Sequence, residues 1–143
     1  MLIRGWLSGD NERIALLEKE CFSDPWNYGM ICDTSQASNF LGLVAEIEGE
    51  VVGYIGSAFV LDEGEILLVA VDGRYRRRGI GEALVNKMTE DLKEKGVLKL
   101  FLEVRRSNQS AYNCYEKCKF TPIGVRKGYY SNGEDAIVME RSL

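Results

Sequence analysis

The chain has 143 residues, of which 45% are hydrophobic and 28% are charged. These fractions are typical of a soluble globular protein, so we predict a single domain over residues 1–143 and exclude a disordered chain. Eighteen basic and 22 acidic residues give a net charge of −4, which argues against a nucleic-acid partner because such partners bind clustered positive charge.

The first half of the chain is rich in strand patterns. Ile14, Leu17 and Cys21 recur at helical spacing, and the helix that they indicate has cap residues in front of it. In chain order we predict a strand at 1–7, a helix from caps at 8–10 to about residue 20, a loop with a short helix at 22–39, hairpin strands at 41–47 and 51–60, a turn at 62–64 and a strand buried on both faces at 65–71.

The second half contains a strand, a helix and a strand within about 40 residues, a crossover that makes its two strands parallel. After the strand at 65–71 we predict a helix at 79–95, a strand at 98–104, a helix capped by Ser107 or Asn108, and strands at 120–126 and 136–140. The fold class is therefore α+β, with a mixed, mostly antiparallel sheet of about six to seven strands, a parallel pair at its centre and about four helices.

The hydropathy of the sequence bears on the cellular location of the protein. The longest apolar run, Ile66–Val71, has six residues, whereas a membrane-spanning helix needs roughly 20. Asp10 and Glu12 interrupt the N-terminal segment before a signal-peptide core develops. We therefore expect a cytoplasmic protein with no membrane partner.

The sequence contains no histidine, which removes every mechanism that uses imidazole as a base or as a metal ligand. Its four cysteines, at positions 21, 32, 114 and 118, form no C-x-x-C pair, so we predict free thiols and no metal site. Proton transfer must then depend on carboxylates, tyrosine, lysine, cysteine or water.

A segment rich in arginine and glycine, Asp72–Gly81, precedes the helix at 79–95. Backbone N–H groups at a helix N-terminus attract anions, glycine lets an anion approach closely, and Arg76–Arg78 add hydrogen bonds to phosphate. We interpret the segment as a pyrophosphate cradle; the alternative is a solvated basic turn. A Walker loop is excluded because its lysine motif is absent, and a dinucleotide fingerprint because Leu84 stands where a third glycine is needed.

Arg76, Gly79 and Gly81 match the pattern [Q/R]-x-x-G-x-[G/A], and the segment Asn108–Tyr115 is similar to N-x-x-A-x-x-[L/F]-Y. In this order, the two motifs resemble those of the Gcn5-related N-acetyltransferase (GNAT) family. The resemblance implies a GNAT-like fold with a splayed central pair of strands, and acetyl-coenzyme A (acetyl-CoA) as the co-substrate.

Further segments are similar to the bacterial ribosomal-protein-alanine N-acetyltransferases within that family. They are Phe22–Trp26, Ala70–Asp72, Leu102–Val104 and Tyr129–Tyr130 with Glu134–Ile137. The resemblance implies an N-acetyltransferase that modifies the N-terminal α-amine of a protein, with the N-terminus of a small-subunit ribosomal protein as its partner. It assigns cofactor binding to Val69, Ala70, Val71, Arg76, Arg77, Arg78, Gly79, Ile80, Gly81 and Asn108.

Two residues are candidates for proton transfer. The resemblance makes Tyr115 the general acid that protonates the departing thiolate; the alternative is an aromatic ring that fills the inner face of its helix. Glu103 stands in an otherwise apolar strand, where an acidic residue is costly unless it is exposed or functional. We predict that Glu103 acts as a base on the acceptor amine, directly or through water; the alternative is a solvent-facing residue on the open side of the sheet.

The acceptor side is predicted from aromatic and acidic residues. Substrate binding is assigned to Trp26, Glu65, Tyr129 and Tyr130. The two tyrosines would either wall a peptide groove or shield a hairpin. The acidic residues at 62, 63, 65, 134 and 135 are predicted to flank the acceptor entrance and attract a cationic amine, or else to be merely solvated.

Two other functions stay open at this point. The divergent segment 27–39 would suit an acetyltransferase of a small amine, such as a polyamine or an aminoglycoside. A non-catalytic acyl-CoA-binding sensor would need the cradle but neither an acid nor a base, so the presence of both Glu103 and Tyr115 argues against it.

Overall fold

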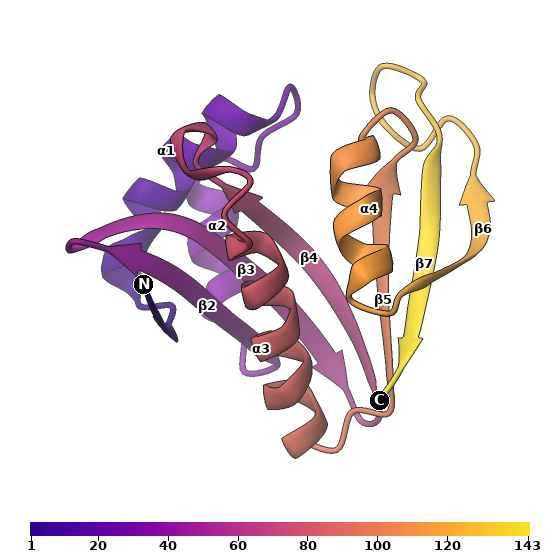
Figure 1. The fold of residues 1–143 in the computed structure, drawn as a ribbon, viewed down its shortest axis with the longest axis horizontal. Coiled ribbons are helices and arrows are strands. Elements are labelled where there is room, and N and C mark those ends of the chain that lie inside the picture. Colours follow the sequence, from indigo (N-terminus) through magenta and orange to yellow (C-terminus); the bar gives the residue numbers. More distant parts are fainter.

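The computed structural model describes residues 1–143 and contains one seven-stranded sheet with the strand order β1-β2-β3-β4-β5-β7-β6 (Figure 1). Neighbouring strands are antiparallel except for β4 and β5, which are parallel, so the predicted mixed sheet is confirmed. The strands are β1 (Leu2–Gly5), β2 (Phe40–Ile47), β3 (Glu50–Val60), β4 (Glu63–Val71), β5 (Lys99–Arg105), β6 (Thr121–Arg126) and β7 (Ala136–Ser142). The helices are α1 (Asn11–Cys21), α2 (Tyr28–Ser35), α3 (Ile80–Glu94) and α4 (Gln109–Lys117).

Helices cover both faces of the sheet and form two separate apolar cores. α3 and α4, on the near face in Figure 1, pack against the central strands in the larger core, which includes Leu84, Met88 and Leu102. α1 and α2 pack on the opposite face in a smaller core, which includes Ile14 and Tyr54. The sheet is therefore covered by one pair of helices on each side.

The N-terminal end of α3 lies close to the sheet because β3 has a glycine beneath it. A Cβ atom at Gly53 would lie 3.3 Å from Cγ2 of Ile80 and 3.3 Å from Cδ1 of Leu84, which is tighter than ordinary van der Waals contact. The apolar stripe that predicts α3, from Ile80 to Leu92, is buried against this surface. The helix end that follows the cradle is thus held firmly on the sheet.

A bulge in β4 ends the pairing of β4 with β5. The β4 partners of Gly56 and Ser57 are Leu68 and Ile66, which leaves Leu67 as an extra residue. A bulge bends its strand and increases the local twist. Pairing with β5 is confined to three residue pairs before this point, and beyond it the two strands diverge in Figure 1. The splayed central pair that the resemblance implies is therefore present.

The prediction for the strand at 65–71 is wrong in two details. The strand begins at Glu63, because only Leu61 and Asp62 form the turn. It is not buried on both faces, because Glu63 and Glu65 are exposed and Val69–Val71 are only half-buried. The other predicted elements are present with slightly shifted ends, and all four cysteines are free thiols. None of the helices combines the length and the apolar content needed to span a membrane.

Candidate active site

The divergence of β4 and β5 opens a cleft of about 200 Å³ in the middle of the sheet. Side chains from helices on both faces line it, so the cleft connects the two sides of the molecule. It brings together six of the predicted site residues, which are Trp26, Val69, Glu103, Asn108, Tyr115 and Tyr130.

The backbone N–H groups of β4 face this cleft at alternate residues. The Asp72 N–H donates to the Val52 carbonyl of β3 at 2.7 Å, and in an antiparallel pair every second residue points to the same neighbour. The Ala70 N–H therefore points to β3, so of the three β4 residues assigned to cofactor binding Ala70 has no N–H group that faces the cleft. The N–H groups of Val69 and Val71 point to the side on which β5 no longer pairs with β4.

The predicted cradle lies at the N-terminus of α3. Gly79 is the N-cap residue with a φ of +77°, a conformation that favours glycine. The Ala83 N–H makes a 3.0 Å bond to the Gly79 carbonyl, so the N–H groups of Ile80, Gly81 and Glu82 have no partner within the helix. The Ile80 side chain is buried in the core, which leaves only its N–H group for a ligand.

The three arginines before this helix end have no carboxylate partners. Arg76–Arg78 are exposed and form no ion pair, whereas the neighbouring Arg74 pairs with Asp72 at 2.8 Å. The Arg76 Nε donates to the Val71 carbonyl at 3.4 Å, on the open side of β4. Their positive charge is therefore available to an anion beside the helix N-terminus.

Asp72 anchors the loop that carries the cradle. Its buried carboxylate accepts hydrogen bonds from the backbone N–H and the guanidinium of Arg74, and it pairs with Arg13 of α1 at 2.9 Å. The hydrogen bonds from Arg74 hold the pKa of Asp72 well below its usual range. These contacts join α1 to the loop before α3.

Asn108 and Tyr115 line the cleft from the side of α4. Asn108 is the N-cap of this helix, and its side-chain oxygen accepts the Ala111 N–H at 3.1 Å, which leaves its amide NH₂ group free for a ligand. Tyr115 is 7% exposed, and its ring packs edge-to-face on Phe120. Burial raises the pKa of Tyr115, so the hydroxyl stays protonated at neutral pH and is available as a donor.

Glu103 lies in a polar and largely buried environment. Its side chain is 15% exposed, and its carboxylate pairs with Arg126 at 2.9 Å. Hydrogen bonding to this carboxylate raises the pKa of the Tyr129 hydroxyl. Partial desolvation of its carboxylate first, and the charge of Glu103 second, raise the pKa of the otherwise exposed Glu65. A solvent-facing Glu103, the alternative considered from the sequence, is thus contradicted.

The predicted aromatic residues lie on two loops at one end of the cleft. The backbone N–H of Trp26 donates to the Glu18 carboxylate at 3.0 Å, which fixes the loop between α1 and α2. The Tyr130 ring lies on the Arg105 guanidinium, 4.0 Å from ring centroid to Cζ. Tyr129 packs edge-to-face on Tyr130 but is 50% exposed and lies outside the cleft lining.

The prediction of an entrance flanked by two acidic turns is wrong. Glu63 lies beside the first residue of β5, whereas Glu134 pairs with Arg105, its last residue, at 3.1 Å. The two turns therefore lie at opposite ends of the strand, and Glu134 is already neutralised. Glu65 lies near Glu103, but it is outside the cleft lining.

Three polar residues of the cleft are missing from the predicted site: Glu18, Asp24 and Arg105. Glu18 is 1% exposed and accepts a 2.5 Å hydrogen bond from the Tyr54 hydroxyl. Its position four residues after Ile14, on the inner side of α1, is a signal of burial that the sequence does contain. Asp24 and Arg105 meet only in three dimensions, so no local pattern pairs them.

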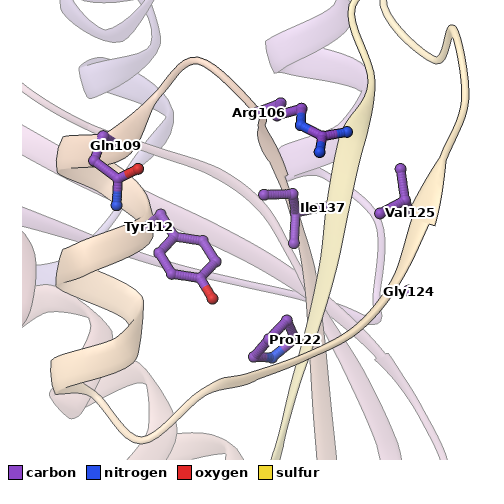
Figure 2. Close-up of a pocket in the computed structure, with 7 residues that line it drawn as sticks. All are labelled: Arg106, Gln109, Tyr112, Pro122, Gly124, Val125 and Ile137. Atoms are coloured by element: carbon purple, nitrogen blue, oxygen red, sulfur yellow. The ribbon is translucent and has the colours of Figure 1, made fainter.

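A second pocket, of about 300 Å³, lies on the other side of α4 (Figure 2). Gln109 and Tyr112 of α4 line it together with Val125 of β6 and Ile137 of β7. It contains none of the predicted site residues. Of the two, only the cleft between β4 and β5 is lined by predicted site residues.

Comparison with known proteins identifies the family of this chain. The family model described as acetyltransferase (GNAT) family matches residues 11–120. The ribosomal protein bS18-alanine N-acetyltransferase of Haemophilus influenzae is 36% identical over 134 residues, which are 91% of this chain and 90% of that protein.

Two crystal structures share the whole fold. That of the ribosomal-protein-S18-alanine N-acetyltransferase from Escherichia coli has a TM-score of 0.92 and 30% identity, with 99% of this chain and 92% of that chain covered. That of Ard1 from Thermoplasma volcanium has a TM-score of 0.93 and 30% identity, with 99% and 97% covered.

The family model and these relatives define the class of the protein, which is an acyltransferase. The chain belongs to the acetyltransferase (GNAT) family, which confirms the resemblance seen in the sequence. It is an N-acetyltransferase, and acetyl-CoA is its acetyl donor.

Replacing Asp72 with Asn tests the anchor of the cradle loop. Because its pKa is lowered on folding, ionised Asp72 stabilises the folded state above the unfolded-state pKa of about 4, and this stabilisation is lost as the pH falls toward the lowered pKa. We expect Asp72→Asn to reduce the free energy of unfolding by on the order of 1 kcal/mol at pH 7. Urea unfolding at pH 7 and pH 3 should show a smaller difference at pH 3.

The exposed Asp33, which forms no ion pair, provides the matched control. Asp33→Asn should unfold like the wild type at both pH values. A destabilisation by Asp72→Asn that is equal at both pH values would show that the ionised carboxylate is not what anchors the loop.

Proposed function

We propose that this protein acetylates the N-terminal α-amine of a protein that begins with alanine, and that its substrate is a small-subunit ribosomal protein in the cytoplasm. The observation that carries the proposal is the match over 91% of the chain to an enzyme named for this reaction on bS18. The cleft supports it, because a passage lined from both faces of the sheet lets donor and acceptor approach from opposite sides.

The residues of the donor side fit acetyl-CoA, which supplies the acetyl group as an activated thioester. The free N–H groups at the N-terminus of α3 and the unpaired Arg76–Arg78 would hold the pyrophosphate. The N–H groups of Val69 and Val71 would bind the pantetheine arm and the thioester carbonyl, where negative charge develops during transfer. The free amide of Asn108 would bond the pantetheine arm.

Glu103 is the proposed base. An amine attacks only in its neutral form, and a peptide α-amine has an ordinary pKa near 8, so a carboxylate has to supply only a modest driving force at neutral pH. Glu103 lies in the cleft, and its pairing with Arg126 fixes its orientation. It would take the proton from the amine directly or through one water molecule.

Tyr115 is the proposed acid. Its buried hydroxyl stays protonated at neutral pH and lies on the α4 side of the same cleft. The raised pKa makes it a weaker acid than free tyrosine, so proton transfer to the sulfur would occur late, when the leaving group carries most of its charge. The proposed base therefore lies on β5 and the proposed acid on α4.

The proposed substrate class is tested with a panel of acceptors. Peptides beginning with alanine or serine should be acetylated faster than spermidine or an aminoglycoside at equal concentration, because aromatic walls such as Tyr130 hold an extended backbone better than a bare alkyl chain. Mass spectrometry measures the product. The same peptides with a blocked N-terminus and an internal lysine are the control and should stay unmodified.

A faster reaction with spermidine or an aminoglycoside than with every peptide would refute the ribosomal-protein substrate and leave only the acetyltransferase. Rapid acetylation of the internal lysine in the blocked peptides would refute the preference for an α-amine.

The role of Tyr115 is tested by Tyr115→Phe, which preserves the packing and removes only the hydroxyl group. We expect kcat to fall by roughly 10²-fold while the Kd for acetyl-CoA changes little, because the lost proton transfer occurs in the transition state. Tyr112→Phe is the matched control, since Tyr112 lies on α4 but lines the pocket of Figure 2. Wild-type turnover by Tyr115→Phe would make Tyr115 a packing residue only.

A further inference from the structure

Among the polar residues of the cleft, Arg105 is the one that bonds two separate loops. It is the last residue of β5 and lies two positions after Glu103, on the same face of the strand. Its side chain is 17% exposed and lines the cleft. Neither acetyl-CoA binding nor proton transfer, as described above, requires it.

The Arg105 guanidinium joins two loops that are far apart in the sequence. Its Nη2 donates to Asp24 in the loop between α1 and α2 at 3.0 Å, and its Nη1 donates to Glu134 in the loop between β6 and β7 at 3.1 Å. Asp24 also accepts a 2.6 Å hydrogen bond from Ser131 of the second loop. The two loops therefore meet at one network of charged groups.

The same guanidinium supports a wall of the cleft. The Tyr130 ring lies on it at 4.0 Å, and Tyr130 belongs to neither apolar core. A guanidinium held by two carboxylates is fixed in its plane, so the ring that stacks on it is fixed as well. The position of this wall therefore depends on Arg105 and on the contact with Tyr129, and not on either apolar core.

This network differs from an ordinary surface ion pair. An exposed pair contributes little because water and salt screen it. Arg105 is mostly buried, bonds two carboxylates from different loops and stacks on an aromatic ring. Its loss would remove both charged contacts and the support of Tyr130 at once, and the Ser131–Asp24 hydrogen bond would still join the two loops.

We propose that Arg105 is the positioning residue of the acceptor channel: by joining the two loops and holding Tyr130, it forms the passage that binds the N-terminal segment of the acceptor. The inference rests on the proposed function, because it takes a peptide as the acceptor. Arg105 does not touch the groups of the cradle, which lie at the N-terminus of α3. Its removal therefore weakens acceptor binding and leaves acetyl-CoA binding intact.

The test compares Arg105→Met with the adjacent Arg106→Met. Arg106 pairs with Asp135 at 3.3 Å and lines the pocket of Figure 2, away from the cleft. For a peptide that begins with alanine, we expect Arg105→Met to raise KM about tenfold or more and to lower kcat by less than about threefold. Arg106→Met should have the wild-type KM, and both variants should keep the wild-type Kd for acetyl-CoA.

Arg105→Lys separates geometry from charge. Lysine keeps the positive charge but cannot bond two carboxylates and stack on the ring at once, so its KM should lie between those of the wild type and Arg105→Met. If Arg105→Met does not fold, Asp24→Asn tests the same contact from an exposed loop and should raise KM about threefold.

Three results would overturn the proposal. The first is an unchanged KM in Arg105→Met or, if that variant does not fold, in Asp24→Asn. The second is a loss of activity confined to kcat, and the third is an equal rise of KM in Arg106→Met. A wild-type enzyme that acetylates no peptide would overturn the proposed function and this inference with it. A wild-type enzyme that acetylates the peptide, with the same KM in Arg105→Met, would overturn the inference alone.

Discussion

The point at which β4 and β5 stop pairing is the feature on which the rest of the site depends. Unpaired N–H and C=O groups in the middle of a sheet are normally costly. Here the bulge at Leu67 bends β4 away after three residue pairs and leaves Val69 and Val71 without strand partners on that side. Arg76 bonds the exposed carbonyl of Val71. The N–H groups remain free, and under the proposed function they bind the thioester.

The two halves of the cleft are held in place by different interactions. On the donor side, α3 is packed tightly over Gly53 in the larger apolar core, so the cradle is set by close packing and by the anchored carboxylate of Asp72. On the acceptor side, the loops meet through Arg105 and its carboxylate partners. Close packing suits the donor, which is always the same molecule, whereas loops joined by polar contacts suit recognition of the proposed acceptor.

Local signals account for what the sequence predicted. The α3 stripe, the cradle glycines and the cap at Asn108 each depend on neighbouring residues, and all three are present. The bulge at Leu67 was not predictable, because it lies in an apolar run with no glycine or proline. The acidic turns look equivalent in the sequence, but the parallel pairing of β4 and β5 sends them to opposite ends of β5. The bridge from Arg105 to Asp24 joins positions 81 residues apart, beyond the range of any local pattern.

Amide hydrogen exchange along β4, measured residue by residue with and without acetyl-CoA, tests whether Val69 and Val71 offer free N–H groups to the acetyl donor. Amides that face an unpaired edge exchange quickly, and amides bonded within a sheet exchange slowly. We expect fast exchange at Val69 and Val71 in the free enzyme, strong protection of both by acetyl-CoA, and slow exchange at Ala70 in either state. Val69 and Val71 amides that are already as protected as Ala70, or that acetyl-CoA leaves unchanged, would contradict this expectation.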